Sequence, residues 1–155
     1  LVDSSSIKNE DEENELIKNL KEVIKDAKDF GILIGLETDY SPQKILKLLK
    51  KIDNDNIVLN YDTGNSASLG FNPKEELTLL GKYIKNIHIK DRKLNGSTVP
   101  FGEGDTNFNL FFSTLRDIDY KGDFIIQGAR IDNESPDITC RKYRDFVMKY
   151  IERYF

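Results

Sequence analysis

The chain has 155 residues, of which 38% are hydrophobic and 32% are charged, and its formal net charge is −4. This balance is typical of one globular domain and excludes a disordered chain. The negative charge disfavours nucleic acid as a partner, because phosphate binders usually carry a basic excess. No apolar run approaches the roughly 20 residues of a membrane-spanning helix. The single cysteine, Cys140, allows no internal disulfide and favours a reducing, cytoplasmic compartment.

The hydrophobic pattern alternates between helices and short buried strands. Apolar residues at helical spacing predict a first helix that follows the acidic run 9–15 and ends at Gly31. Further helices are expected over residues 42–52, 73–83, 108–118 and 137–154. Continuous apolar runs, typical of strands in a parallel sheet, occupy residues 32–36, 57–61, 84–91 and 124–127. Residues 1–6 resemble the tail of one more strand, and residues 63–70 and 92–106 are expected to be loops.

Strict alternation of strands and helices with short connections predicts right-handed parallel crossovers. An open doubly wound sheet and part of a closed barrel both fit this pattern. The chain has neither a GxGxxG motif after a strand nor a GxxxxGK[ST] motif. Neither of these nucleotide-binding signatures is therefore present.

Polar residues stand where the predicted strands end. Glu37, Asp62 and Gln127 close three apolar runs, and His88 and Asp91 lie at the end of a fourth. The carboxyl ends of parallel strands form the ligand-binding edge of such folds, so these side chains are expected to converge. Carboxylate, imidazole and amide groups together suit Mn²⁺, Mg²⁺, Co²⁺ or Zn²⁺.

Each of these residues also has an ordinary explanation when taken alone. A carboxylate after a strand usually just begins a loop, and a lone histidine in a strand is more often a core residue than a metal ligand. Their coincidence on one edge favours a metal site.

Six stretches carry a resemblance to a known family. They are IGLE (34–37), NYDTGN (60–65), NIHIKDR (86–92), FGEG (101–104), YKG (120–122) and FIIQGAR (124–130). In these stretches the chain resembles the sugar phosphate isomerase/epimerase family of xylose-isomerase-like barrels. The resemblance implies an α/β fold of parallel (β/α) units, the C-terminal half of a TIM barrel with four to five strands and flanking helices. Residues 1–155 would form one partial barrel domain whose N-terminal half is absent.

The resemblance also implies the site residues and the chemistry. It assigns the metal ligands to Glu37, Asp62, His88 and Gln127, the last in a position where the family commonly has Glu. It further places Lys90, Asp91 and Arg130 near the substrate. The expected function is a metal-dependent isomerase or epimerase of a sugar or sugar phosphate that acts through an enediolate intermediate, with Glu37 as the catalytic base.

Gln127 bears on the reaction type, because an amide oxygen can bind a metal but cannot shuttle a proton at neutral pH. A one-base isomerase, or an epimerase that recruits another acid such as Asp91, is then favoured over a two-base epimerase. The alternative is a non-enzymatic or inactive half-barrel that retains a metal-binding edge. An endonuclease of the same barrel type is disfavoured by the single histidine and the lack of basic excess.

The expected partners are a small sugar or sugar phosphate, without nucleic acid or membrane. A half-barrel leaves bare sheet edges, so a homo-oligomer or the missing N-terminal half is expected to cover them. Residues 92–105 are expected to form either a lid hinged at glycines or a plain surface connection.

Overall fold

The computed structural model describes residues 1–155 and contains six α-helices and four β-strands. The helices are α1 (Glu10–Asp29), α2 (Pro42–Ile52), α3 (Thr63–Ser68), α4 (Pro73–Leu80), α5 (Phe108–Asp117) and α6 (Pro136–Tyr154). The strands are β1 (Ile34–Leu36), β2 (Ile57–Asp62), β3 (Ile84–Ile89) and β4 (Asp123–Ile126). Two short 3₁₀ turns, η1 (Asp3–Ser5) and η2 (Gly81–Tyr83), complete the chain.

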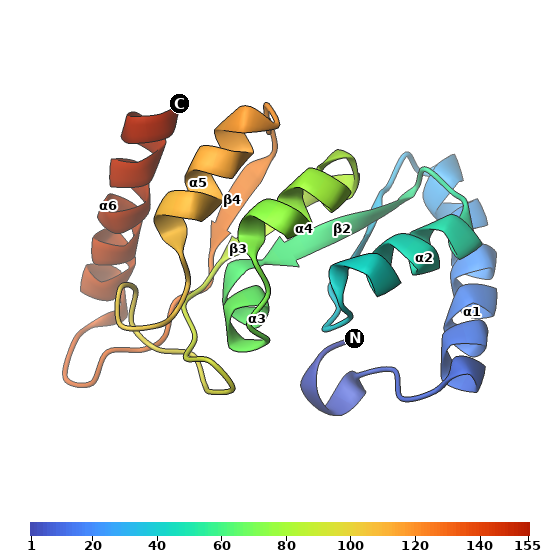
Figure 1. Ribbon diagram of the computed structural model, residues 1–155, viewed down its shortest axis with the longest axis horizontal. Coiled ribbons are helices and arrows are strands. Elements are labelled where there is room, and N and C mark those ends of the chain that lie inside the picture. The colour runs from blue at the N-terminus through green and yellow to red at the C-terminus, as the bar shows by residue number, and fades with distance from the viewer.

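The four strands form one parallel sheet in the order β1-β2-β3-β4, so strands that follow one another along the chain are also neighbours in space. Helices α2, α4, α5 and α6 lie in a row against one face of this sheet (Figure 1). Each parallel connection needs a crossover, and the helices supply it on that face. The predicted fold class, parallel (β/α) units of a partial TIM barrel, is confirmed, with four strands.

The hydrophobic core lies between the sheet and this row of helices. Ile87 and Ile89 of β3 are fully buried, as are Phe112 and Leu115 of α5 and Leu77 of α4. Alternate residues of a strand point to opposite faces. In β2 and β3, apolar residues that face the helices therefore alternate with residues that face the other side of the sheet. Burial of this one face is what fixes the register of the sheet.

The other face of the sheet carries the polar residues. Asn60 lies opposite Asn86 in the β2–β3 register, and Asp62 lies opposite His88. The register of these two strands shifts between Leu59 and Asn60, an irregularity of the kind that re-aims side chains beside functional sites. The polar side chains therefore stand side by side at the carboxyl ends of β2 and β3.

Two expectations from the sequence are wrong. The first residues form no strand, because Asp3–Ser5 form a 3₁₀ turn. The Asp39 backbone N–H donates to the Leu1 carbonyl. Residues 63–68 are not a loop but the short helix α3, because the Asp62 side chain caps it by accepting the Asn65 backbone N–H.

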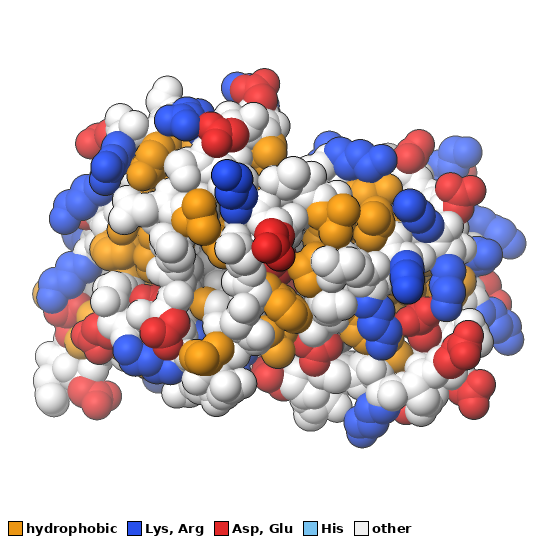
Figure 2. Space-filling view, in the orientation of Figure 1, with side chains coloured by type: hydrophobic (Ala, Val, Ile, Leu, Met, Phe, Trp, Pro, Cys, Tyr) orange, Lys and Arg blue, Asp and Glu red, His pale blue; other side chains and the backbone are white.

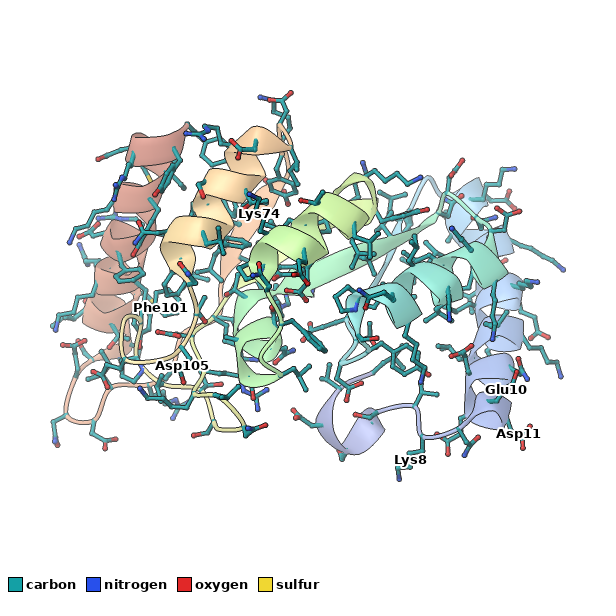
Figure 3. All side chains as sticks on the ribbon, viewed as in Figure 1. Lys8, Glu10, Asp11, Lys74, Phe101 and Asp105 are labelled. Carbon is teal, nitrogen blue, oxygen red and sulfur yellow. The ribbon has the colours of Figure 1, made fainter.

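The segment 92–106 is held firmly at both of its ends. The buried carboxylate of Asp91 accepts backbone N–H bonds from Gly102, Gly104 and Thr106. The Phe101 ring packs 4.2 Å from that of Tyr143 in α6, and Figure 3 shows Phe101 in this loop near α6. These contacts favour the plain surface connection over a hinged lid.

The surface that carries the helices mixes both signs of charge, with apolar patches between them (Figure 2). None of the helices combines the length and the apolar character needed to cross a membrane.

Candidate metal centre

Three elements bring the candidate ligands to one point. Glu37 directly follows β1, Asp62 is the last residue of β2, and His88 lies near the end of β3. One ligand atom from each lies within 4.8 Å of the others. The structure thus brings together Glu37, Asp62 and His88.

The distances within this cluster are short for groups from three different strands. His88 Nδ1 lies 3.4 Å from Glu37 Oε2 and 4.0 Å from Asp62 Oδ2. The Asp62 side chain is only 1% exposed, whereas those of His88 and Glu37 are 23% and 26% exposed. The site therefore has a buried floor at Asp62 and an open side at Glu37 and His88.

An amide at the centre of the sheet orients two of the three groups. Asn60 Nδ2 donates to Glu37 Oε2 at 2.9 Å and lies 3.2 Å from His88 Nδ1. Its own oxygen accepts from Asn86 Nδ2 at 2.7 Å, which fixes the orientation of the amide. Outer groups of this kind hold metal ligands in place.

A second asparagine, Asn65, joins the two carboxylates through its backbone and its side chain. The Asn65 backbone N–H donates to Asp62 Oδ1 at 2.8 Å, and its side-chain Nδ2 donates to Glu37 Oε1 at 2.8 Å. Arg92 Nη1 in turn donates to Asn65 Oδ1 at 2.9 Å. Both oxygens of Glu37 thus receive an amide N–H, one from each asparagine.

Lys90 contributes a positive charge to the same edge. Its ammonium nitrogen lies 3.3 Å from Asp62 Oδ2, with the side chain 15% exposed. The lysine stem runs over Gly64, where an added Cβ would stand 2.7 Å from Lys90 Cγ. Glycine at position 64 therefore leaves room for Lys90 to reach the carboxylate.

Burial raises the pKa of Asp62, and this desolvation is the largest of the influences on it. The Asn65 N–H and the Lys90 charge oppose the shift, while the nearby Glu37 charge adds to it. Desolvation outweighs the pairing because Asp62 is almost wholly removed from water. A buried carboxylate that is costly to keep ionised gains from any further cation placed beside it.

The donor set fits a divalent cation. Two carboxylate oxygens and one imidazole nitrogen match the ligands of Zn²⁺, Mn²⁺ and Co²⁺ in proteins. Bonds of about 2.0–2.2 Å put ligand atoms within about 4.4 Å of one another, close to the spread of this cluster.

The fourth predicted ligand, Gln127, comes from the end of the fourth strand. Gln127 follows β4, and its backbone N–H donates to the Ile89 carbonyl, which puts it on the same edge as Lys90. Its side chain is exposed and forms no hydrogen bond within the chain. Arg130 lies further along the same segment, is also exposed, and forms no ion pair with the chain's own carboxylates.

Asp91 has a different setting from the one expected of a substrate contact. Its side chain is almost completely buried, and both of its oxygens are taken by backbone N–H groups of the 92–106 segment. A Cβ at Gly104 would collide with this carboxylate. The arrangement favours an indirect role, in which Asp91 shapes the loop that follows Lys90.

Asn60, Asn65 and Arg92 were not among the residues singled out from the sequence. All three lie within the motifs NYDTGN and NIHIKDR. A polar residue two positions before Asp62, on the same face of the strand, was a signal for Asn60. No local pattern indicates that Arg92 reaches Asn65, since the contact joins the segment after β3 to helix α3.

Comparison with known proteins gives a consistent family. Residues 3–144 match the family described as xylose isomerase-like TIM barrel. An uncharacterized protein of Methanocaldococcus jannaschii, MJ1311, is 28% identical over 145 residues, which cover 86% of this chain and 47% of that protein. The L-ribulose-5-phosphate 3-epimerase UlaE of Escherichia coli is 31% identical over 134 residues, covering 83% of this chain and 47% of the enzyme.

Solved structures show the same fold. The IOLI protein, in a crystal structure with a bound zinc atom, superposes with a TM-score of 0.82 at 20% identity, covering all of this chain and 62% of that one. The chain spans about half the length of the curated relatives it matches.

Proposed function

The chain belongs to the xylose isomerase-like TIM-barrel family, and on that premise we propose that it carries the metal site of a sugar or sugar phosphate isomerase or epimerase. The observation that carries the proposal is the convergence of Glu37, Asp62 and His88 at the carboxyl ends of three neighbouring strands. The name of the relative UlaE, an L-ribulose-5-phosphate 3-epimerase, supports a sugar phosphate. A neighbouring structure, a D-allulose 3-epimerase with D-allulose bound, supports a ketose (TM-score 0.73, 18% identity).

The proposed mechanism assigns a task to each residue. Glu37, Asp62 and His88, with Gln127, would hold a divalent ion, which would supply polarisation of the substrate carbonyl. Glu37, which lies on the open side of the site, removes the proton from the carbon beside that carbonyl to give an enediolate. Lys90 and Arg130 provide positive charge for a phosphate or carboxylate of the substrate.

Gln127 sets the expected outcome of the reaction. It is the proposed fourth ligand, and its amide cannot carry a proton. Glu37 is then the single base of this segment, which favours isomerisation, or epimerisation with an acid from elsewhere. The variant Gln127→Glu is expected to gain epimerase activity while keeping the metal, and unchanged activity would contradict this part of the proposal.

A partner for the open face of the sheet is also part of the proposal. Leu33 beside β1 is 50% exposed and Ile125 of β4 is 47% exposed, although both lie on the sheet or its edge. The strands at both edges leave backbone groups unpaired within the chain. We propose that a second copy or an N-terminal half-barrel covers this face. Sedimentation of the chain as a monomer at micromolar concentration would argue against the second copy.

The experiment that tests the function is hydrogen exchange at the substrate. The protein, with Mn²⁺ in D₂O, is incubated with ketoses and their 5-phosphates, and deuterium incorporation beside the carbonyl is followed by NMR. Incorporation that is abolished by EDTA and by Glu37→Gln is expected. Each ketose is run beside its phosphate, so the preferred substrate class is read in the same experiment.

The alternative function is a metal-binding half-barrel without catalysis. It is favoured by the coverage, since the chain spans about half of its curated relatives, and substrate contacts in a barrel come from loops all around its rim. Stoichiometric metal binding without deuterium incorporation would select this alternative over the enzyme.

A further inference from the structure

Asn65 contacts both carboxylates of the candidate site, and no other residue does so by hydrogen bonds. Its backbone N–H reaches Asp62 Oδ1 and its side-chain N–H reaches Glu37 Oε1, each at 2.8 Å. Asn65 is itself buried, with 6% of its surface exposed. One buried residue thus holds both carboxylates, Asp62 through its backbone N–H and Glu37 through its side-chain amide.

The orientation of the Asn65 amide depends on Arg92. Arg92 Nη1 donates to Asn65 Oδ1 at 2.9 Å, so the amide nitrogen must face Glu37. A reversed amide would place its oxygen against the Glu37 carboxylate and its N–H groups against the guanidinium, which is repulsive on both sides. Arg92 therefore selects the orientation that binds Glu37.

The Arg92 side chain is itself held by the turn at residues 92–96, which Arg92 begins. Its Nε and Nη2 donate to the Gly96 carbonyl at 3.0 and 2.8 Å. The same turn is tied to α3, because the Asn95 N–H donates to the Ser68 carbonyl at 2.8 Å. The guanidinium that reaches Asn65 is thus supported by the turn at residues 92–96.

We propose that Asn65 and Arg92 are positioning residues that hold the carboxylates of Glu37 and Asp62, with Arg92 acting through Asn65. The inference rests on the proposed function, since it concerns the same site, and it extends the site to the turn at residues 92–96. Loss of an outer contact of a metal ligand weakens metal binding by about 10- to 100-fold.

Electrostatics makes the test of Arg92 sharp. If only the charge of Arg92 mattered, removing it would strengthen binding of a divalent cation, because like charges repel. If Arg92 positions Asn65, removing it weakens that binding. Arg92→Met is therefore expected to weaken Mn²⁺ binding about tenfold, and Arg92→Lys, which keeps a donor, is expected to restore part of it.

In the Asn65→Leu variant, the leucine side chain is close in size to asparagine. The variant keeps the backbone N–H bond to Asp62 and lacks the side-chain bond to Glu37. Isothermal titration with Mn²⁺ is expected to show a loss of about 10- to 100-fold. The double variant Asn65→Leu/Arg92→Met is expected to bind Mn²⁺ no more weakly than Asn65→Leu alone. Arg92 acts through Asn65, so the two losses of affinity should not add. Asn19→Leu and Arg144→Met, both on exposed helix surfaces, are the matched controls and should bind as the unmodified chain does.

The outcomes separate this inference from the proposed function. Additive losses in the double variant, or tighter binding by Arg92→Met, would overturn the inference while the metal site stands. If the unmodified chain binds no Mn²⁺, the proposed function fails. The positioning is then read in the metal-free protein from solvent exchange of the Asn65 side-chain amide protons. Arg92→Met should speed that exchange, and an unchanged rate would overturn the inference.

Discussion

The carboxyl ends of β1–β3 and the carboxyl end of β4 belong to one sheet edge, yet they are organised very differently. At the first three strands, Glu37, Asp62 and His88 are joined by amides from Asn60 and Asn65. At the fourth, the side chains of Gln127 and Arg130 are exposed, and neither has a hydrogen-bond or ion-pair partner within the chain.

The difference shows which part of the site the chain shapes by itself. The three candidate ligands are already held close together, so little reorganisation would be needed if they bind an ion. β1 and β4 are both edge strands, but only the residue after β1 is held, since Glu37 accepts amide N–H bonds from Asn60 of β2 and Asn65 of α3.

The largest expected effect follows from removing the buried carboxylate of Asp91, which holds the segment after β3. Asp91→Ala leaves three backbone N–H groups without their acceptor inside the protein. Hydrogen bonds to a charged group are worth more than neutral ones, so we expect the free energy of unfolding to fall by about 4 kcal/mol. Urea denaturation measures it. Asp117→Ala, at an exposed ion pair, is the control, and an equal effect of the two changes would contradict the role given to Asp91.

The second prediction removes a member of the ordered cluster. His88→Ala is expected to lower Mn²⁺ affinity by more than the roughly 100-fold that loss of an outer contact costs. The fold should be retained, because the His88 side chain is 23% exposed and lies outside the hydrophobic core. Titration calorimetry gives the affinity. Binding as tight as in the unmodified chain would remove His88 from the site.

The third prediction sharpens the contrast by changing the β4 end, where the side chain of Gln127 is exposed. Gln127→Glu adds a charged oxygen donor on the edge of β4, and Mn²⁺ affinity is expected to rise about tenfold if this side chain reaches the ion. Gln43→Glu, on an exposed position of α2, adds the same charge far from the site. Equal behaviour of the two variants would show that the β4 end contributes no ligand.

The smallest expected effect concerns Glu76, a residue of α4. Glu76 is buried, and its carboxylate accepts hydrogen bonds from Tyr61 and Ser66. Burial raises its pKa above the usual 4.5, and the two hydroxyl groups oppose the shift only in part.

Because the folded pKa is raised, the folded state binds more protons than the unfolded chain, and stability falls as pH rises from about 4.5 through the folded pKa. Glu76→Gln lacks this loss and is expected to be more stable by about 1 kcal/mol near pH 8. The gain should vanish near pH 4. Thermal unfolding at the two pH values measures the difference, and a gain that is equal at both would contradict the raised pKa.

Much of this arrangement follows from the sequence. The strand runs and the Ser-Pro and Asn-Pro helix starts predict the (β/α) order, and residues that end apolar runs predict the cluster of Glu37, Asp62 and His88. These signals are local, because period and strand position are set by neighbouring residues.

The remaining features depend on contacts between distant segments. The helical state of residues 63–68 follows from the cap by Asp62, and the burial of Asp91 follows from a loop that folds back over it. The contact of Arg92 with Asn65 joins residues 27 positions apart. A sequence pattern contains the residues of such contacts but not their pairing.

The most direct test uses the fact that His88 is the only histidine of the chain. Its imidazole ¹⁵N and ¹H signals can be followed by NMR while Zn²⁺ is added. If Glu37, Asp62 and His88 hold a metal, one His88 ring nitrogen should shift in a transition that is complete at one equivalent, and EDTA should reverse it. His88 signals that stay unchanged through one equivalent of Zn²⁺ would contradict the metal site.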